Sequence, residues 1–248
     1  MQLPEATSAH AATVDAMNEF VHLFMLALCV GWTIFFFYCL YRFWHKRHPK
    51  ADYVGVRGHA SSHVEVAVVI IEAILLIGFA LPFWAQRVEA FPSGPDVVNI
   101  RATAYRFGWA FHYPGADGKF GRVHSDFFVS DPAGLDRQDP NAFDDIVSVG
   151  TMLMPVDKPV LVTVASKDVI HNLSMVPLRV SQDAMPGAEF PTWFTPTKTG
   201  TWEIICGQLC GEGHSSMKAF YEVKTLGEFE KWKLENAPKP PVPAPVEG

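Results

Sequence analysis

An uncharged apolar run near the start of the chain limits its fold most strongly. Residues 20–41 contain no Asp, Glu, Lys or Arg, and the segment Trp-Thr-Ile-Phe-Phe-Phe-Tyr-Cys-Leu within them is apolar on every face. A helix rises about 1.5 Å per residue, so a run of this length crosses a hydrocarbon core of about 30 Å. We therefore predict a transmembrane helix over residues 19–44.

A second apolar run covers residues 64–84 and ends in proline, tryptophan and arginine, which is typical of a membrane interface. We predict a second transmembrane helix over residues 63–88. It carries two carboxylates, Glu65 at its start and Glu72 about two turns further in. An ionised carboxylate is costly inside a bilayer, so we expect Glu72 to be protonated, part of a proton path or in contact with a partner subunit, the last being favoured.

The charges around the two runs orient this helical hairpin. Between the runs, the basic residues outnumber the single acid Asp52: they are Arg42, Lys46, Arg47, Lys50 and Arg57. The first nineteen residues contain no Lys or Arg. The positive-inside rule places the loop 45–62 in the cytoplasm, and residues 1–18 and everything after residue 88 outside. A signal peptide is the alternative for the first run, but the run is too long and no basic region precedes it; cleavage of a short leader stays open.

The sequence changes after residue 91 to short runs rich in β-branched residues, separated by Pro, Gly and Asp. Runs such as Pro-Val-Leu-Val-Thr-Val-Ala and Gly-Thr-Trp-Glu-Ile-Ile are typical of strands, and Pro-Gly-Ala-Asp-Gly of a turn. We predict an all-β sandwich of Greek-key type over residues 92–225. Residues 226–248 predict a short helix and an extended proline-rich tail.

One loop near the end of the predicted sandwich gathers soft metal ligands. From Cys206 to Met217 it reads Cys-Gly-Gln-Leu-Cys-Gly-Glu-Gly-His-Ser-Ser-Met, with two thiols, an imidazole and a thioether. His171, upstream in a predicted strand, would supply a second imidazole. This combination favours copper, whereas zinc seldom recruits methionine.

Two thiolates in one loop can bridge two copper ions and leave one imidazole for each ion. The candidate ligands are His171, Cys206, the backbone carbonyl of Gln208, Cys210, His214 and Met217. Such a centre changes little in geometry when it gains an electron, so it would transfer electrons. The alternatives are a Cys206–Cys210 disulfide, a structural zinc site and cysteines that only pack. The disulfide explains neither His171 nor Met217, and zinc does not explain Met217.

Three further features refine the prediction. Six aspartates from residue 126 to residue 145 form either a solvated loop or a surface that steers a basic partner. Cys29 and Cys39 lie inside the first predicted span, where packing is the expected role. The chain contains no Cys-x-x-Cys-His, so we expect no covalent c-type haem, and we expect no nucleic-acid partner.

Two spans and a β domain with Cys-x3-Cys-x3-His-x2-Met and an upstream His resemble subunit 2 of cytochrome c oxidase, over nearly the whole chain except the tail. The resemblance implies a cupredoxin domain whose six candidate ligands bind a dinuclear copper centre, CuA. It implies haem-copper subunit 1 and further oxidase subunits as partners, and a c-type cytochrome or a cytochrome-bearing reductase as electron donor. It also implies that residues 183–187 lie against the catalytic subunit, and that the chain lies in the inner membrane with its β domain in the periplasm or an equivalent space.

The chain departs from the family at several positions. Gln208 replaces a glutamate that often helps to bind magnesium, and a neutral amide is a weaker ligand for that cation, so magnesium is doubtful. Phe107 replaces a tryptophan through which electrons usually enter, and Trp109 is the candidate substitute. The alternatives are that the donor docks differently or that Trp109 only packs in the core. Glu65 matches a glutamate that admits protons to one channel of the catalytic subunit; a solvated helix-end carboxylate is the alternative.

We therefore expect an electron-transfer subunit of a respiratory oxidase, in which oxygen reduction and proton pumping belong to the complex. A quinol oxidase subunit would lack the copper ligands, and a nitrous-oxide reductase would need a further large domain. A membrane-tethered copper carrier or assembly protein is the main alternative.

Overall fold

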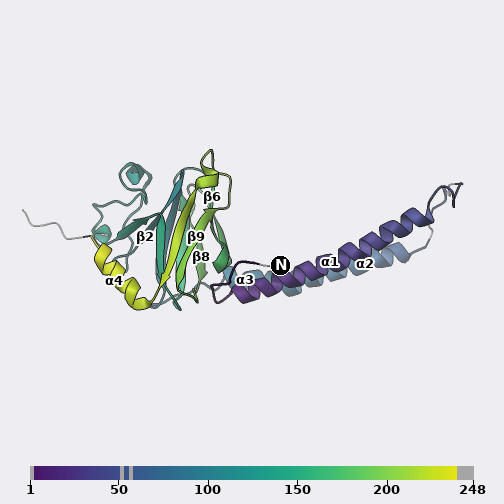
Figure 1. Ribbon diagram of the computed structural model, residues 1–248, viewed down its shortest axis with the longest axis horizontal. Coiled ribbons are helices and arrows are strands. Elements are labelled where there is room, and N and C mark those ends of the chain that lie inside the picture. The colour runs from purple at the N-terminus through teal and green to yellow at the C-terminus, as the bar shows by residue number, and fades with distance from the viewer. Residues whose placement is uncertain (1–2, 51–52, 56–57, 239–248) are drawn as a thin grey trace, which may run out of the picture. The chain divides into compact units, whose positions relative to one another are not determined.

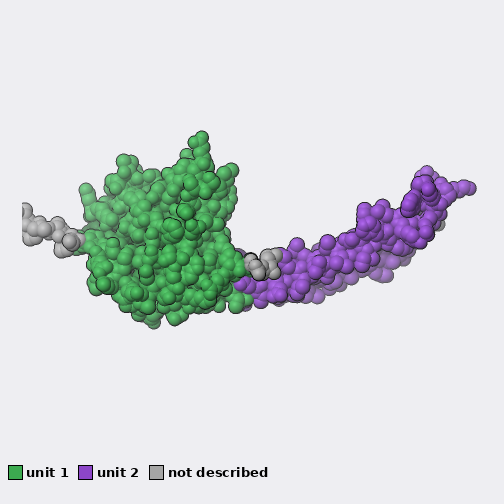
Figure 2. All heavy atoms as spheres, in the orientation of Figure 1, with its two compact units in different colours: residues 1–12, 91–248 green, residues 13–90 purple. Residues whose placement is uncertain are grey.

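The computed structural model describes residues 3–50, 53–55 and 58–238. Asp52, Arg57 and the proline-rich tail from residue 239 onward lie outside the described residues. The chain divides into two compact units, which Figure 2 shows in two colours. One unit is helical and covers Thr13–Ala90, and the other combines residues 1–12 with residues 91–248.

The helical unit contains two helices that are long and apolar enough to cross a membrane, Ala11–Arg42 and Ala60–Val88. Helix α1 (Ala11–Arg42) starts before the predicted span because Ala, Met and Glu, which are good helix formers, precede the apolar run. The two helices lie side by side in Figure 1, and the rings of Phe20 and Phe79 are 5.3 Å apart. The prediction of two apolar helices ahead of a β domain is confirmed.

The second helix changes its winding near its outer end. It consists of α2 (Ala60–Leu75), a π-helical turn η1 (Leu76–Ala80) and α3 (Leu81–Val88). Pro82 is the second residue after the π turn. Because proline lacks a backbone N–H and its ring collides with the carbonyl of the fourth residue before it, a wider turn at this place relieves the collision.

The other unit is a sandwich of two five-stranded sheets, ordered β3-β2-β1-β5-β8 and β4-β10-β9-β6-β7 (Figure 1). Its strands are β1 (Val98–Tyr105), β2 (Gly108–Tyr113), β3 (Ile146–Val149), β4 (Thr151–Pro155), β5 (Val160–Ser166), β6 (His171–Met175), β7 (Val180–Ala184), β8 (Phe190–Phe194), β9 (Gly200–Cys206) and β10 (Lys218–Lys224). The pairs β1–β5 and β4–β10 are parallel, and the others are antiparallel. The predicted all-β sandwich is confirmed.

The core lies between the two sheets and follows strand alternation. In β5, Val160, Val162 and Val164 are fully buried while the residues between them are partly exposed. They belong to one cluster with Leu173 and Met175 of the other sheet. Burying each such side chain stabilises the fold by about 1.5–3 kcal/mol.

Helix α4 (Leu226–Asn236) closes one end of this core. A capping box between Thr225 and Glu228 fixes its first turn. Phe229 is buried, and its ring stacks on that of Trp232 at 5.9 Å. The ring of Trp232 also meets Tyr113 edge-on at 5.0 Å. These aromatic contacts hold the predicted short helix against the sandwich.

The N-terminal segment is part of the β unit. Thr7 donates its N–H to the Pro177 carbonyl at 2.9 Å and accepts from Thr197 N at 2.8 Å. The Ser8 hydroxyl donates to the Leu178 carbonyl at 2.7 Å, and both Thr7 and Ser8 are buried. The segment therefore belongs to the same compact unit as the sandwich.

The acidic stretch is less solvated than its composition suggests. Asp145 is fully buried, where it accepts from His112 Nε2 at 2.6 Å and from Gly121 N at 2.7 Å. Asp136 is buried against Arg122, which holds the pKa of Asp136 below its usual value through their hydrogen bond. Asp136 and Asp145, two of the six aspartates in this stretch, are thus bound inside the loop, whereas Asp126 is exposed.

Replacing Ser8 by alanine tests the attachment of the N-terminal segment. The substitution leaves the buried Leu178 carbonyl without its hydroxyl donor, so we expect the free energy of unfolding to fall by about 1 kcal/mol. The measurement is denaturant unfolding of the full chain in detergent, followed by tryptophan fluorescence. In the control Ser130→Ala, an exposed hydroxyl loses a local bond to Phe127, and a change within about 0.5 kcal/mol is expected. Equal effects of both substitutions would contradict the attachment.

Candidate metal centre

Strand pairing brings the two segments that carry the predicted ligands together. His171 is the first residue of β6 and Cys206 the last residue of β9, and these neighbouring strands pair in antiparallel register with Leu173 opposite Cys206. The end of β9 therefore lies beside the start of β6. Cys210, the short helix η5 (His214–Ser216) and Met217 follow in the loop that leads to β10.

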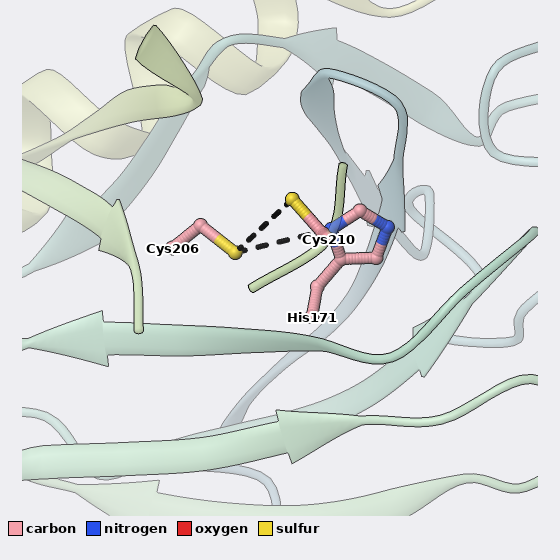
Figure 3. Close-up of side chains that lie close together, drawn as sticks. All are labelled: His171, Cys206 and Cys210. Atoms are coloured by element: carbon pink, nitrogen blue, oxygen red, sulfur yellow. Dashed lines mark hydrogen bonds between the residues drawn. The ribbon is translucent and has the colours of Figure 1, made fainter. Parts of the chain in front are cut away.

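Three of the predicted ligands form a compact buried group, drawn in Figure 3. The Sγ atoms of Cys206 and Cys210 are 3.8 Å apart, and His171 Nδ1 is 3.9 Å from the sulfur of Cys206. The thioether sulfur of Met217 lies 3.2 Å from His171 Nδ1 and 3.6 Å from the sulfur of Cys210. All four side chains are buried, His171 completely.

The remaining two donors lie next to the sulfur atoms of the two cysteines. His214 Nδ1 is 3.6 Å from the sulfur of Cys210. The backbone carbonyl of Gln208 is 3.1 Å from the sulfur of Cys206. The structure thus brings all six predicted donors together.

The spacing of the donors fits metal ions better than the alternatives. A metal–sulfur bond of about 2.3 Å places two tetrahedral ligands about 3.7 Å apart, close to the separations found here. Cys206 and Cys210 are free thiols, and 3.8 Å between their sulfurs excludes a disulfide in this structure. A buried thioether beside two thiols and two imidazoles fits copper, because zinc sites rarely include methionine.

The thiol of Cys210 has little tendency to ionise without a metal. Burial raises the pKa of Cys210 to about 11, and the neighbouring thiol of Cys206 contributes to the rise. Thiols bind metal ions as thiolates, so a soft cation has to displace these protons when it binds.

A carboxylate that the sequence analysis missed holds the buried imidazole. His171 Nε2 is 2.8 Å from Asp168 Oδ1, and Asp168 also accepts from Arg106 N at 2.8 Å. Burial by itself raises the pKa of Asp168, but these hydrogen bonds outweigh it and hold the pKa below its usual value. The sequence contained an indication of this contact, since Asp168 stands three residues before His171. A search for metal ligands, however, does not reveal the residues that hydrogen-bond to those ligands.

The ligand loop is supported by close contacts at its glycines. A Cβ atom on Gly207 would lie 2.6 Å from the side-chain oxygen of Asn172, and one on Gly213 only 2.4 Å from the ring of Phe107. Gly211 has a φ of +131°, which favours glycine. Phe107 and Asn172 therefore fix the path of the loop, and any side chain at these glycines would displace it.

The structure does not give Trp109 the surface position that direct uptake of an electron requires. Its ring is fully buried and meets the ring of His171 edge-on, with centroids 6.3 Å apart. Phe107, whose ring lies against Gly211 and Gly213 of the loop, is 40 % exposed. The reason is strand parity: Trp109 belongs to β2 and points into the core, whereas Phe107 lies in the preceding turn.

The other predicted residues lie elsewhere in the chain. Glu65 and Glu72 are exposed on α2 in the helical unit, and their spacing of seven residues puts them on one helix face. Asp183 lies in β7, where its carboxylate accepts from the Asn172 amide at 2.7 Å. Asp183 is therefore tied to the strand that carries His171.

Comparison with known proteins agrees with this arrangement. The family model of the cytochrome C oxidase subunit II transmembrane domain matches residues 1–85, and that of the periplasmic domain matches residues 98–223. The alternative cytochrome c oxidase subunit 2 of Bradyrhizobium diazoefficiens is 31% identical over 202 residues, which cover 80% of this chain and 71% of that protein. Cytochrome c oxidase subunit 2 of Cereibacter sphaeroides is 26% identical over 250 residues, 94% of this chain and 78% of that protein.

Among solved structures, the periplasmic domain of subunit II of cytochrome oxidase of Bradyrhizobium japonicum is similar, with 30% identity and a TM-score of 0.44. The match covers 59% of this chain and 96% of that structure. The two family models together span both the apolar helices and the β-sandwich. The chain therefore belongs to the cytochrome c oxidase subunit II family, whose members are components of a haem-copper oxidoreductase complex.

Proposed function

We propose that this chain is the electron-transfer subunit of a respiratory terminal oxidase. It would hold the dinuclear copper centre CuA, receive electrons from a c-type cytochrome and pass them to haem in the catalytic subunit, where oxygen is reduced. The observation that carries the proposal is the cluster of two thiols, two imidazoles, a thioether and a carbonyl. Each of these donor atoms lies 3.1–3.9 Å from at least one other donor atom of the cluster. Bound copper would supply one-electron redox chemistry.

The distances suggest how the donors divide between two ions. Cys206 and Cys210 would lie between the ions as shared thiolates. His171 pairs with Met217, since Nδ1 and Sδ are 3.2 Å apart. His214 would serve the other ion together with the carbonyl of Gln208. Because Gln208 contributes its backbone, the amide side chain does not affect copper, and we do not propose a magnesium ion at this residue.

The protein's contribution is to exclude water and fix the donors. His171 is fully buried and Met217 nearly so, and the loop is braced by Phe107 and Asn172. Donors held in this way move little when charge changes, which favours rapid electron transfer. A carrier that releases copper would instead need donors that the solvent and a partner can reach.

The surface next to the loop suggests where a donor protein binds. Leu209, between the two cysteines, is 76 % exposed. The ring of Phe107, in the turn that covers the loop, is also exposed. Exposed apolar residues at a redox site are typical of a contact with a partner. We propose that the donor touches this surface and that Trp109 acts inside the domain, in contact with His171.

The helical unit would join the chain to the catalytic subunit in the inner membrane, with the sandwich in the periplasm or an equivalent space. Glu72 lies within an apolar helix and is exposed in the isolated chain. A carboxylate at this depth requires a polar partner, so we propose that it meets a group of a neighbouring subunit. Glu65, on the same helix face, is the candidate for a proton path into that subunit.

Copper content and electron paramagnetic resonance of the full chain in detergent test the function. We expect two copper ions per chain that share one unpaired electron, because Cys206 and Cys210 would supply thiolates to both ions. Cys206→Ser should abolish the shared-spin spectrum, since serine provides no thiolate. Cys39→Ser should change neither quantity, because Cys39 belongs to α1 of the helical unit and is not one of the proposed ligands.

A single copper ion with a mononuclear spectrum would contradict this function. Loss of copper to a mild chelator at a rate similar to that of free peptide ligands would also contradict it, and would support the copper carrier instead.

The contact of Phe107 with Gly213 predicts a pair of compensating substitutions. Gly213→Ala places a Cβ atom 2.4 Å from the ring of Phe107, and we expect the strain to cost about 1–3 kcal/mol and to weaken copper binding. Phe107→Ala removes the ring, so the double variant should bind copper more tightly than Gly213→Ala alone. Competition titration with a copper chelator measures both affinities.

Gly227→Ala is the matched control, because a Cβ atom there meets nothing within 4 Å. It should bind copper as the wild type does. If the two substitutions Gly213→Ala and Phe107→Ala were simply additive, the steric account of the loop would be wrong.

A further inference from the structure

Asp168 occupies an unusual position between the metal loop and the opposite sheet. It lies in the turn between β5 and β6, three residues before His171. Its Oδ1 atom is 2.8 Å from His171 Nε2 and accepts from Val169 N at 2.7 Å. Its Oδ2 atom accepts from Arg106 N at 2.8 Å. One carboxylate therefore receives three N–H donors from three different residues.

The first consequence concerns the tautomer of His171. A carboxylate can only accept, so the proton of the neutral imidazole has to lie on Nε2. The lone pair is then on Nδ1, the atom that faces Met217 Sδ at 3.2 Å and Cys206 Sγ at 3.9 Å. Asp168 thus presents His171 in the form that can bind a metal ion toward the sulfur atoms.

The second consequence concerns the turn that covers the loop. Arg106, whose N–H binds Oδ2, directly precedes Phe107, and the ring of Phe107 lies against Gly211 and Gly213. The same carboxylate therefore fixes a ligand on one strand and the aromatic cover of the loop on another. Movement of Asp168 would be felt at both places.

The bond to Val169 N alone would make Asp168 an ordinary turn residue, with no effect on the metal. The bonds to His171 and Arg106 go beyond that role, because one donor is a side chain and the other is a backbone N–H from a different turn. The side chain is 28 % exposed, so its charge is partly screened but lies in contact with a fully buried imidazole.

We infer that Asp168 is a positioning residue of the metal centre, which fixes the tautomer and orientation of His171 and lowers the reduction potential of the bound copper by its negative charge. The inference rests on the proposed function, since it concerns copper held by the loop. The charge favours the more positive, oxidised form of a nearby centre.

Asp168→Asn in the full, detergent-solubilised chain tests this inference. The amide keeps the shape but removes the charge and one acceptor. We expect two copper ions still to bind, with an affinity about 10- to 100-fold lower. At a fixed solution potential the reduced-to-oxidised ratio should rise about two- to tenfold, tenfold being about 59 mV for one electron. The copper hyperfine splitting should change as well.

Asp96→Asn is the matched control. Asp96 is an exposed aspartate that pairs with Lys158 at 2.7 Å before the start of β1, whereas the metal loop lies near the end of that strand. It loses the same charge far from the loop, so its affinity and potential should equal those of the wild type. Asp168→Glu, which retains the charge, should keep the potential nearer to the wild-type value than Asp168→Asn does, and it carries the comparison if the asparagine variant does not fold.

If Asp168→Asn has the copper affinity and the reduction potential of the wild type, the inference is overturned and Asp168 is an ordinary turn residue. The outcome is separable from that of the proposed function. Copper stoichiometry of the wild type tests the function, and the ratio of variant to wild-type affinity tests the positioning role. The same ratio of variant to wild-type affinity can be measured with Co²⁺. The positioning of His171 can therefore be tested even if the wild type does not bind a pair of copper ions.

Discussion

The antiparallel pairing of β6 with β9 is the contact on which the metal centre depends. It places the first residue of one strand, His171, beside the last residue of the other, Cys206, although the two are far apart in the sequence. Backbone hydrogen bonds within a sheet fix this position without any metal. The ligand loop then has to bring only Cys210, His214 and Met217 back toward that point before β10 begins. Two paired interior strands with a short braced loop at their ends are a sound basis for a preformed site.

Much of the architecture could be predicted because it depends on local composition. The two apolar runs predict the helices, the β-rich runs predict the sandwich, and the spacing of soft ligands after Cys206 predicts the cluster. The side chains that support the cluster could not be predicted in this way. Asp168 carries no metal-ligand pattern of its own, and its role depends on a turn that folds it back against His171. Residues 7 and 8 have no strand periodicity, and their place in the β unit depends on distant carbonyl groups.

The aromatic residues show why position within a strand matters more than residue type. Tryptophan at 109 suggested a surface role by resemblance, yet β2 turns that side chain into the core and leaves Phe107 in the exposed turn. The acidic stretch shows the same principle with charges. Asp145 and Asp136 are used inside the loop to hold His112 and Arg122, so composition overstates the charge available to a partner. Burial decides which groups the outside of the domain presents.

Anomalous diffraction at the copper absorption edge, from crystals of the copper-loaded chain, tests the central claim most directly. The account predicts two copper positions, both within bonding distance of the sulfur atoms of Cys206 and Cys210. One position should lie beside His171 and Met217, and the other beside His214 and the Gln208 carbonyl. A single copper position between the cysteines, or copper bound only to histidines elsewhere on the chain, would contradict it.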